Sequence, residues 1–244
     1  MGLIEVRDEG DIRWIGLNRP DKRNAIDQAT SNAFSAALDD ARARPCVLIV
    51  HSVTPGIFAA GADIAELRER DADAALLAIN AGLFEKLEAH RWPTIAAVDG
   101  PALGGGCELA LACDFRIASP RAYFGQPELS LGILAGAGGN WRLAQAAGQQ
   151  VARRMLYAGA RLTAAEARDA GLADELADDP SAVAVVLAGK ITRQSWRALE
   201  LTKLALRSHR PATTTFDVAA QALLFGSQDK YDRMTAFLDR RRDG

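Results

Sequence analysis

Cysteine and histidine are scarce in this sequence. Its 244 residues include three cysteines, at 46, 107 and 113, and three histidines. Scattered cysteines in apolar surroundings do not make a disulfide framework, and no cysteine or histidine has the spacing of a metal ligand set. We therefore expect reduced thiols in the core, a cytoplasmic location and no metal site.

Long apolar runs and an excess of one charge are also missing. No stretch approaches the length of a membrane span, and the N-terminus carries acids early, unlike a signal or transit peptide. The formal net charge is −2. A chain so near neutrality has no general attraction for nucleic acid or an anionic membrane. We expect neither partner, and any anionic ligand must be bound locally.

The common nucleotide-binding motifs do not occur at the most glycine-rich turn. The sequence GGGCE at 104–108 is not GxGxxG, and no Gly-Lys-Ser/Thr follows it as in a P-loop. With 49% apolar and 25% charged residues, the chain has an ordinary globular composition and enough length for a full core.

Strand-like and helix-like segments alternate in the first half of the chain. Strand-like runs lie at 3–7, 12–17, 46–51 and 94–98, and helical spacing covers 26–43 and 72–89. The first two runs flank a turn and predict a hairpin, whereas the continuous apolar runs are typical of buried parallel strands. This order predicts an α/β fold.

From Asn140 onward almost every segment has helical spacing, including 213–225 and 228–242. A mixed front part followed by a helical tail predicts two regions. We expect a core domain at 1–190 and a C-terminal helical oligomerisation region at 191–244.

The stretch ALGGGCELALACD at 102–114 organises the rest of the chain. It follows the apolar run at 94–98 and predicts a strand, a glycine turn and a helix. The first N–H groups of a helix have no intrahelical partner and can bind a developing negative oxygen, with Glu108 beside them. The helix dipole and tight packing also explain an acid and glycines there, so this stretch alone does not establish a site.

Four motifs follow one another in a fixed order: FAAGAD at 58–63, GGGCE at 104–108, GQPE at 125–128 and GAGG at 136–139. With LNRP at 17–20 and MTAFLDRR at 234–241, they resemble the crotonase superfamily, most closely the enoyl-CoA hydratases. The resemblance runs nearly end to end. It implies a crotonase-like α/β spiral of ββα or βββα turns, a C-terminal helical trimerisation region, and a homotrimer or homohexamer.

The resemblance also implies a site for an acyl-CoA thioester. The backbone N–H groups of Ala62 and Gly105 would form an oxyanion hole for the thioester carbonyl. Glu108 and Glu128, 20 residues apart, would be the catalytic acids, and the amide of Gly136 would help to hold the water.

Contacts with coenzyme A are implied in the same way. The adenine would lie near the backbone of Ala60 and Ala62 and near Asp63, and Arg19 would lie by the phosphates. Phe237 and Arg240 would reach a coenzyme bound in this or a neighbouring subunit. Coenzyme A enters as part of the substrate, and no separate cofactor is expected.

Hydration of a conjugated thioester explains why these groups are needed. Negative charge develops on the carbonyl oxygen, where each fixed amide contributes about 3 kcal/mol. Two carboxyl groups flanking one water share the proton transfers, which are worth roughly 10²- to 10⁴-fold. Retention of both acids favours addition of water to a trans-2-enoyl-CoA, giving a 3-hydroxyacyl-CoA in fatty acid β-oxidation or related acyl-CoA catabolism.

Two alternatives stay open. One is an enoyl-CoA isomerase or a pathway-specific acyl-CoA lyase of the same superfamily; the other is a crotonase-fold protein that binds RNA or another partner. Four departures from the family pattern bear on substrate contacts. Ala65 stands where a lysine is frequent, and Ala135, Asn140 and Trp141 replace the usual proline, threonine and glutamine around the GAGG motif.

Overall fold

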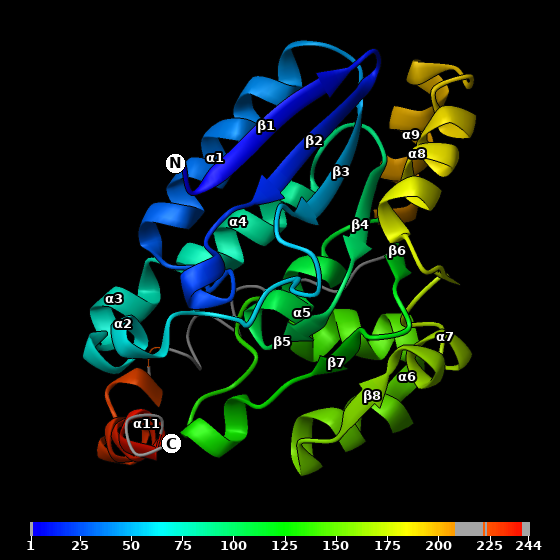
Figure 1. Cartoon of the computed structure of the whole chain (residues 1–244). Coiled ribbons are helices and arrows are strands. Elements are labelled where there is room, and N and C mark those ends of the chain that lie inside the picture. The colour runs from blue at the N-terminus through cyan, green and yellow to red at the C-terminus, as the bar shows by residue number, and fades with distance from the viewer. Residues whose placement is uncertain (1, 208–221, 223, 241–244) are drawn as a thin grey trace.

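The computed structural model describes residues 2–207, 222 and 224–240 (Figure 1). The strands are β1 Ile4–Glu9, β2 Ile12–Leu17, β3 Val47–Ser52, β4 Thr94–Val98, β5 Pro101–Leu103, β6 Phe115–Ala118, β7 Tyr123–Gly125, β8 Arg161–Thr163 and β9 Glu175–Leu176. The α-helices are α1 Gln28–Asp40, α2 Ile64–Glu69, α3 Ala72–Leu76, α4 Ile79–Glu88, α5 Gly105–Leu111, α6 Gly139–Ala158, α7 Ala164–Asp169, α8 Pro180–Ile191, α9 Trp196–Arg207 and α11 Gln228–Arg240. A 3₁₀ turn, η3, covers Glu128–Leu131.

The larger sheet has the strand order β1-β2-β3-β4-β6-β9. β1 and β2 form an antiparallel hairpin, and the remaining neighbours pair in parallel, with Leu48 opposite Thr94. The predicted hairpin and the parallel pairing of the two buried runs are therefore confirmed. The α/β class is confirmed with them.

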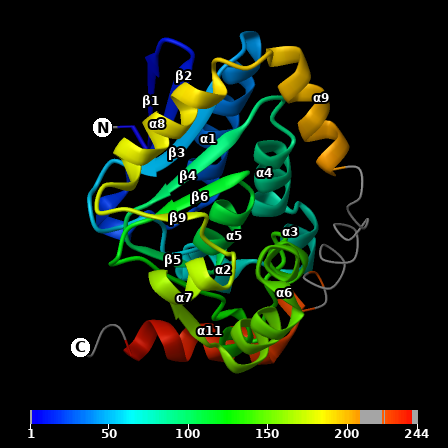
Figure 2. The same ribbon diagram turned by 90° about the vertical axis from the view of Figure 1, so that its right-hand side faces the viewer.

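The two faces of this sheet are covered by different helices (Figure 2). Leu48 and Val50 of β3 point to the face packed by α1, α4 and α5, whereas Val47 and Ile49 point to the face packed by α8. Alternate residues of a strand point to opposite faces, so an uninterrupted apolar run is buried on both sides. This explains why the run at 46–51 carries no polar residue before His51.

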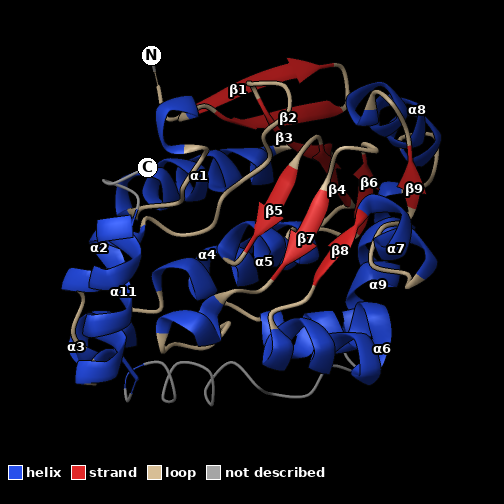
Figure 3. Ribbon diagram, turned by 60° about the horizontal axis from the view of Figure 1, so that its bottom comes forward, coloured by secondary structure: helices blue, strands red, loops and turns tan. Residues whose placement is uncertain are grey.

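A second, smaller sheet has the order β5-β7-β8 and lies below the first (Figure 3). β5 and β7 are parallel, and β8 joins β7 antiparallel, with Phe124 opposite Leu162. The strands β8 and β9 were not predicted: they lie in the gaps between the predicted helical segments 149–157, 163–170 and 181–192, and β8 shares only residue 163 with one of these segments. These strands have three and two residues, too few for a local period, and their partners in the sheet define them.

One predicted helix is interrupted. The segment 72–89 divides into α3 and α4 at Ala78, which has a φ of 49°. The helical spacing predicts two separate segments at 140–147 and 149–157, and the break between them is confirmed: α6 is kinked at Gly148, where φ is 77° and ψ is 161°. Most of the predicted helix at 213–225 lies outside the described residues.

The last helix, α11, packs against α2 and η3 beside the glycine-rich motifs (Figure 1). Its Met234 is buried with Leu67, Leu131 and Ile133. Lys230, also buried, donates hydrogen bonds to the carbonyl oxygens of residues 67, 68 and 70 at the end of α2. The proposed division of the chain at residue 190 stays a prediction.

Candidate active site

The FAAGAD loop lies directly against the start of α5. Leu103 N donates to Ala59 O, and Ala59 N donates to Pro101 O, both at 3.1 Å. The contact is so close that an added Cβ on Gly106 would lie 2.1 Å from Ala59 O. Only glycine fits there, because any side chain would separate the two segments. The predicted strand, turn and helix are confirmed, with the short strand β5 between the apolar run and the turn.

This contact brings the amides of Ala62 and Gly105 together. A Cβ built on Gly105 would lie 3.5 Å from Ala62 N. Neither N–H group donates a hydrogen bond to any residue that the structure describes, and both residues line the same cavity. Two unengaged amides side by side can bind one oxygen that gains negative charge.

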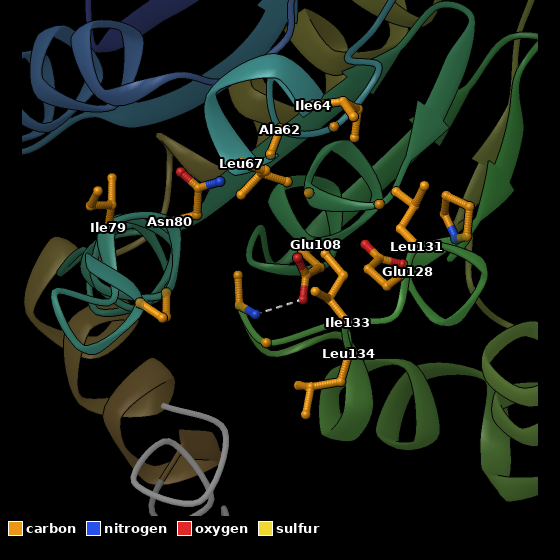
Figure 4. A pocket seen from close by; sticks show the side chains of 18 of the residues that line it. Ala62, Ile64, Leu67, Ile79, Asn80, Glu108, Glu128, Leu131, Ile133 and Leu134 are labelled. Carbon is orange, nitrogen blue, oxygen red and sulfur yellow. Dashed lines mark hydrogen bonds between the residues drawn. The ribbon is translucent and has the colours of Figure 1, made fainter. Parts of the chain in front are cut away.

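The cavity has a volume of about 100 Å³ and lies between the FAAGAD loop, α4, α5 and η3 (Figure 4). Six of the predicted site residues line it: Ala60, Ala62, Gly105, Glu108, Glu128 and Gly136. The rest of the wall is largely aliphatic, with Ile64, Leu67, Ile79, Leu131, Ile133 and Leu134. The structure thus joins segments that are up to 76 positions apart in the sequence.

Glu108 extends from the first turn of α5 into the cavity and is only 3% exposed. Its Oε1 accepts a hydrogen bond from Ala137 N (dashed line in Figure 4) and another from Gly139 N, each at 2.8 Å. The GAGG motif therefore holds one carboxylate oxygen by two main-chain amides. Gly136 lines the cavity too, but its own N–H donates to Leu134 O at 2.8 Å. Its role toward water stays a prediction.

Glu128 begins η3 and enters the cavity from the opposite side at 9% exposure. An added Cβ on Gly104 would lie 2.7 Å from its Oε1, so this carboxyl group adjoins the start of α5. Burial, followed by the negative charge of Glu108, raises the pKa of Glu128 well above its ordinary value. The cavity thus contains one carboxylate fixed by amides and one carboxyl group that favours its neutral form.

Gln126 lies behind Glu128 and was missed by the sequence reasoning. It is 2% exposed, and the amide orientation assigned from the surrounding hydrogen-bond pattern directs its nitrogen to Glu128, 3.2 Å from Oε1 and 3.1 Å from Oε2. The available signal was a polar residue inside the GQPE motif. Because the side chain touches the carboxyl group, it affects the proton affinity and direction of that group.

Comparison with known proteins settles the family. A family model described as enoyl-CoA hydratase/isomerase matches residues 7–243. The chain belongs to this family. It is 39% identical to 2,3-dehydroadipyl-CoA hydratase of Escherichia coli over 99% of the chain and 97% of that protein. It is 37% identical to crotonyl-CoA hydratase of Syntrophomonas wolfei over 98% of the chain and 96% of that protein.

A solved structure supports the same assignment. The crystal structure of an enoyl-CoA hydratase/isomerase from Mycobacterium paratuberculosis superposes with a TM-score of 0.89 and 29% identity, covering 97% of this chain and 98% of that one. The expected crotonase-type fold is therefore confirmed.

A second residue missed in the sequence, Arg142, supports the GAGG loop of this enoyl-CoA hydratase/isomerase family member. Its buried guanidinium donates to Ala137 O at 2.7 Å and to Glu88 Oε2 at 2.8 Å. It also lies 4.4 Å from the ring centroid of Trp141. The departure at Trp141 thus supplies an aromatic face for a cation that holds the loop beside Glu108.

The residues predicted to contact coenzyme A are only partly gathered. Arg19 and Asp63 face each other, with Arg19 Nη2 3.2 Å from Asp63 Oδ2. Phe237 packs on the apolar cluster beside the cavity, whereas Arg240 lies exposed at the end of α11, with Nε donating to Ala236 O. The contacts of these residues with the nucleotide of coenzyme A stay predictions.

The described residues contain neither a metal-binding cluster nor a helix that could span a membrane. No group of three or more histidine, cysteine, aspartate or glutamate side chains is arranged to hold a metal ion there. None of the helices in that part of the chain is long and apolar enough to cross a membrane. The three cysteines are buried and free.

Proposed function

We propose that the protein is an enoyl-CoA hydratase, which adds water across the 2,3 double bond of a trans-2-enoyl-CoA to give a 3-hydroxyacyl-CoA. One observation carries this proposal: two carboxyl groups, Glu108 and Glu128, and two unengaged amides, Ala62 and Gly105, line a single cavity. The full-length similarity to proteins named as hydratases supports it.

The amides supply the electrostatic part of the mechanism. When water attacks the β-carbon, electrons move through the double bond and negative charge collects on the thioester oxygen. The N–H groups of Ala62 and Gly105 donate to that oxygen and stabilise the enolate. Removal of one such donor typically costs about 3 kcal/mol of transition-state stabilisation.

The carboxyl groups supply the proton transfers. One proton leaves the attacking water and one proton reaches the α-carbon, so a basic oxygen and an acidic hydrogen are needed on the same side of the substrate. Glu108, held by two amides, and Glu128, whose neutral form burial favours, provide both. Because the two groups interact, they act as a coupled pair and no fixed assignment of acid and base is made.

The cavity favours a short, uncharged acyl group. Its volume of about 100 Å³ is below the roughly 300–1,000 Å³ of typical ligand sites, so the coenzyme must lie mostly outside it. Among the described residues that line it there is no lysine or arginine to pair with a distal carboxylate. We therefore propose crotonyl-CoA as a better substrate than 2,3-dehydroadipyl-CoA. Coenzyme A is part of the substrate, and no separate cofactor takes part.

We also propose a homotrimer or homohexamer in the cytoplasm. Leu201 and Leu204 on α9 are 50% and 61% exposed and lie three residues apart on one helix face. A second subunit would cover such an apolar face. Light scattering coupled to gel filtration tests the assembly, with a monomer as the contradicting result.

The decisive assay for the function follows the absorbance of the conjugated thioester. Purified protein is mixed with crotonyl-CoA, and the double bond should disappear with formation of 3-hydroxybutyryl-CoA. A product in which the double bond has moved and no water has been added would favour the isomerase alternative.

A further inference from the structure

The loop at 18–27 is fastened to the FAAGAD loop over its whole length. Ala60 N donates to Arg23 O at 3.0 Å, and Ile26 N donates to Gly61 O at 2.8 Å. Ile26 also pairs with Ala62 in a parallel bridge. The segment that carries the Ala62 amide therefore takes its position from residues about 40 places earlier in the chain.

A buried asparagine side chain holds the interior of the 18–27 loop by hydrogen bonds. Arg23 and Asn24 have φ values of 50° and 55°, a left-handed conformation that is uncommon outside glycine. Asn24 is buried and holds this turn: its Oδ1 accepts from Arg19 N at 2.8 Å, and its Nδ2 donates to Phe58 O at 2.9 Å. The turn thus also contacts the first residue of the FAAGAD loop, Phe58.

Arg19 contacts the last residue of the FAAGAD loop, Asp63. Its Nη2 lies 3.2 Å from Asp63 Oδ2 and 3.0 Å from Asp27 Oδ2, and its Nη1 donates to Ala25 O at 3.0 Å. Asp63 directly follows Ala62, and its Oδ1 caps α2 by accepting from Ala65 N at 3.1 Å. The Ala62 N–H belongs to the peptide whose Gly61 carbonyl accepts from Ile26 N, and the contact between Arg19 and Asp63 restrains the residue that directly follows Ala62.

We propose that Arg19 is a positioning residue of the oxyanion hole, which fixes the direction of the Ala62 N–H through Asp63 and does not bind the phosphates of the coenzyme. The Arg19 guanidinium is already paired with two carboxylates, Asp27 and Asp63, whose combined charge of −2 exceeds its own charge of +1. All three side chains are mostly buried. This inference rests on the proposed function.

The test compares two substrates. Crotonyl-CoA carries phosphates, and crotonyl-pantetheine has the same thioester without them. For Arg19→Gln we expect kcat to fall about 10- to 100-fold on both substrates with KM changed less than about twofold, since a small misplacement of a catalytic group costs that much. Arg19→Lys should recover part of the loss, because it keeps the charge but not the planar fork.

The matched control is Lys22→Gln, which removes an exposed cation from the same loop. It should leave kcat unchanged on both substrates. A defect of Arg19→Gln that raises KM for crotonyl-CoA and disappears with crotonyl-pantetheine would overturn the proposal, because it would mark Arg19 as a phosphate ligand.

A second readout separates this proposal from the proposed function. Butyryl-CoA labelled with ¹³C at the thioester carbonyl has no double bond to hydrate, and donors in the oxyanion hole lower its C=O stretching frequency. The wild type should show this lowering and Arg19→Gln should lose part of it. An equal frequency in both proteins refutes the role of Arg19. If the wild type does not hydrate crotonyl-CoA but the C=O frequency still depends on Arg19, the result refutes only the proposed hydratase activity. If Arg19→Gln does not fold, Arg19→Lys and Asp63→Asn are measured in the same way.

Discussion

Glu108 and Glu128 line the same cavity, but they are held by different kinds of partner. Glu108 Oε1 accepts from two main-chain amides, whereas Glu128 faces the side-chain amide of Gln126. Burial and the charge of Glu108 raise the pKa of Glu128. Two carboxyl groups held in different surroundings are suited to share the roles of acid and base.

Replacement of either acid should abolish most of the activity. Glu108→Gln and Glu128→Gln each keep the side-chain shape and remove a group that transfers a proton. We expect kcat for crotonyl-CoA hydration to fall about 10²- to 10⁴-fold in each variant. Steady-state kinetics measure it, with thermal melting as the control for folding. A variant with wild-type kcat would remove that carboxyl group from the mechanism.

Glu128→Gln should also change the pH dependence of stability. The raised pKa means that the folded state favours neutral Glu128. Below the ordinary pKa of 4.5, Glu128 is neutral in both the folded and the unfolded state, so its burial does not lower the stability. As pH rises through the folded-state pKa, the wild type loses about 1.4 kcal/mol for each unit of the shift. Urea unfolding between pH 4 and pH 8 should show the variant gaining stability over the wild type as pH increases. A constant difference contradicts the raised pKa.

Loss of the Gln126 amide should raise the pKa of Glu128 further. Gln126→Leu removes a donor that stabilises the charged carboxylate, so the limb of the pH–kcat profile that reports Glu128 should move to higher pH. Gln150→Leu is the matched control, because Gln150 is exposed on α6. A shift to lower pH, or equal profiles for both variants, would show that Gln126 does not act on Glu128.

Gly105→Ala should separate activity from stability. The new Cβ meets Ala62 N at 3.5 Å and Gly61 at 3.7 Å, which are ordinary contacts, so the fold should be retained. The methyl group occupies the space between the two amides where the thioester oxygen binds, and we expect kcat to fall about 100-fold. Gly82→Ala, where nothing lies within 4 Å, should keep full activity. Full activity in Gly105→Ala would place the oxyanion hole elsewhere.

The parts of the fold that follow from local pattern were predictable. The continuous apolar runs that became β3 and β4, and the helical spacing of α1, are properties of the segments themselves. β5, β8 and β9 are too short for that, and pairs such as Phe124 with Leu162 define them. The break at Ala78 falls inside an alanine-rich run that gives no sign of it.

The candidate site shows the same division. Glu108, Glu128 and the amide positions sit in motifs whose order indicates the family. Gln126 contacts Glu128, and Arg142 contacts Ala137. These contacts form only when the chain folds, so the sequence alone does not identify the partners. For Arg19, the motif suggested phosphate, and the structure places the guanidinium against Asp27 and Asp63.

The most direct test of the hydratase is the fate of solvent oxygen. Crotonyl-CoA is incubated with the protein in H₂¹⁸O, and the product is analysed by mass spectrometry. The proposed mechanism predicts 3-hydroxybutyryl-CoA with ¹⁸O at C3, and loss of this product when Glu108 and Glu128 are both replaced by glutamine. Recovery of unlabelled thioester, or of an acyl-CoA with a shifted double bond and no ¹⁸O, would contradict it.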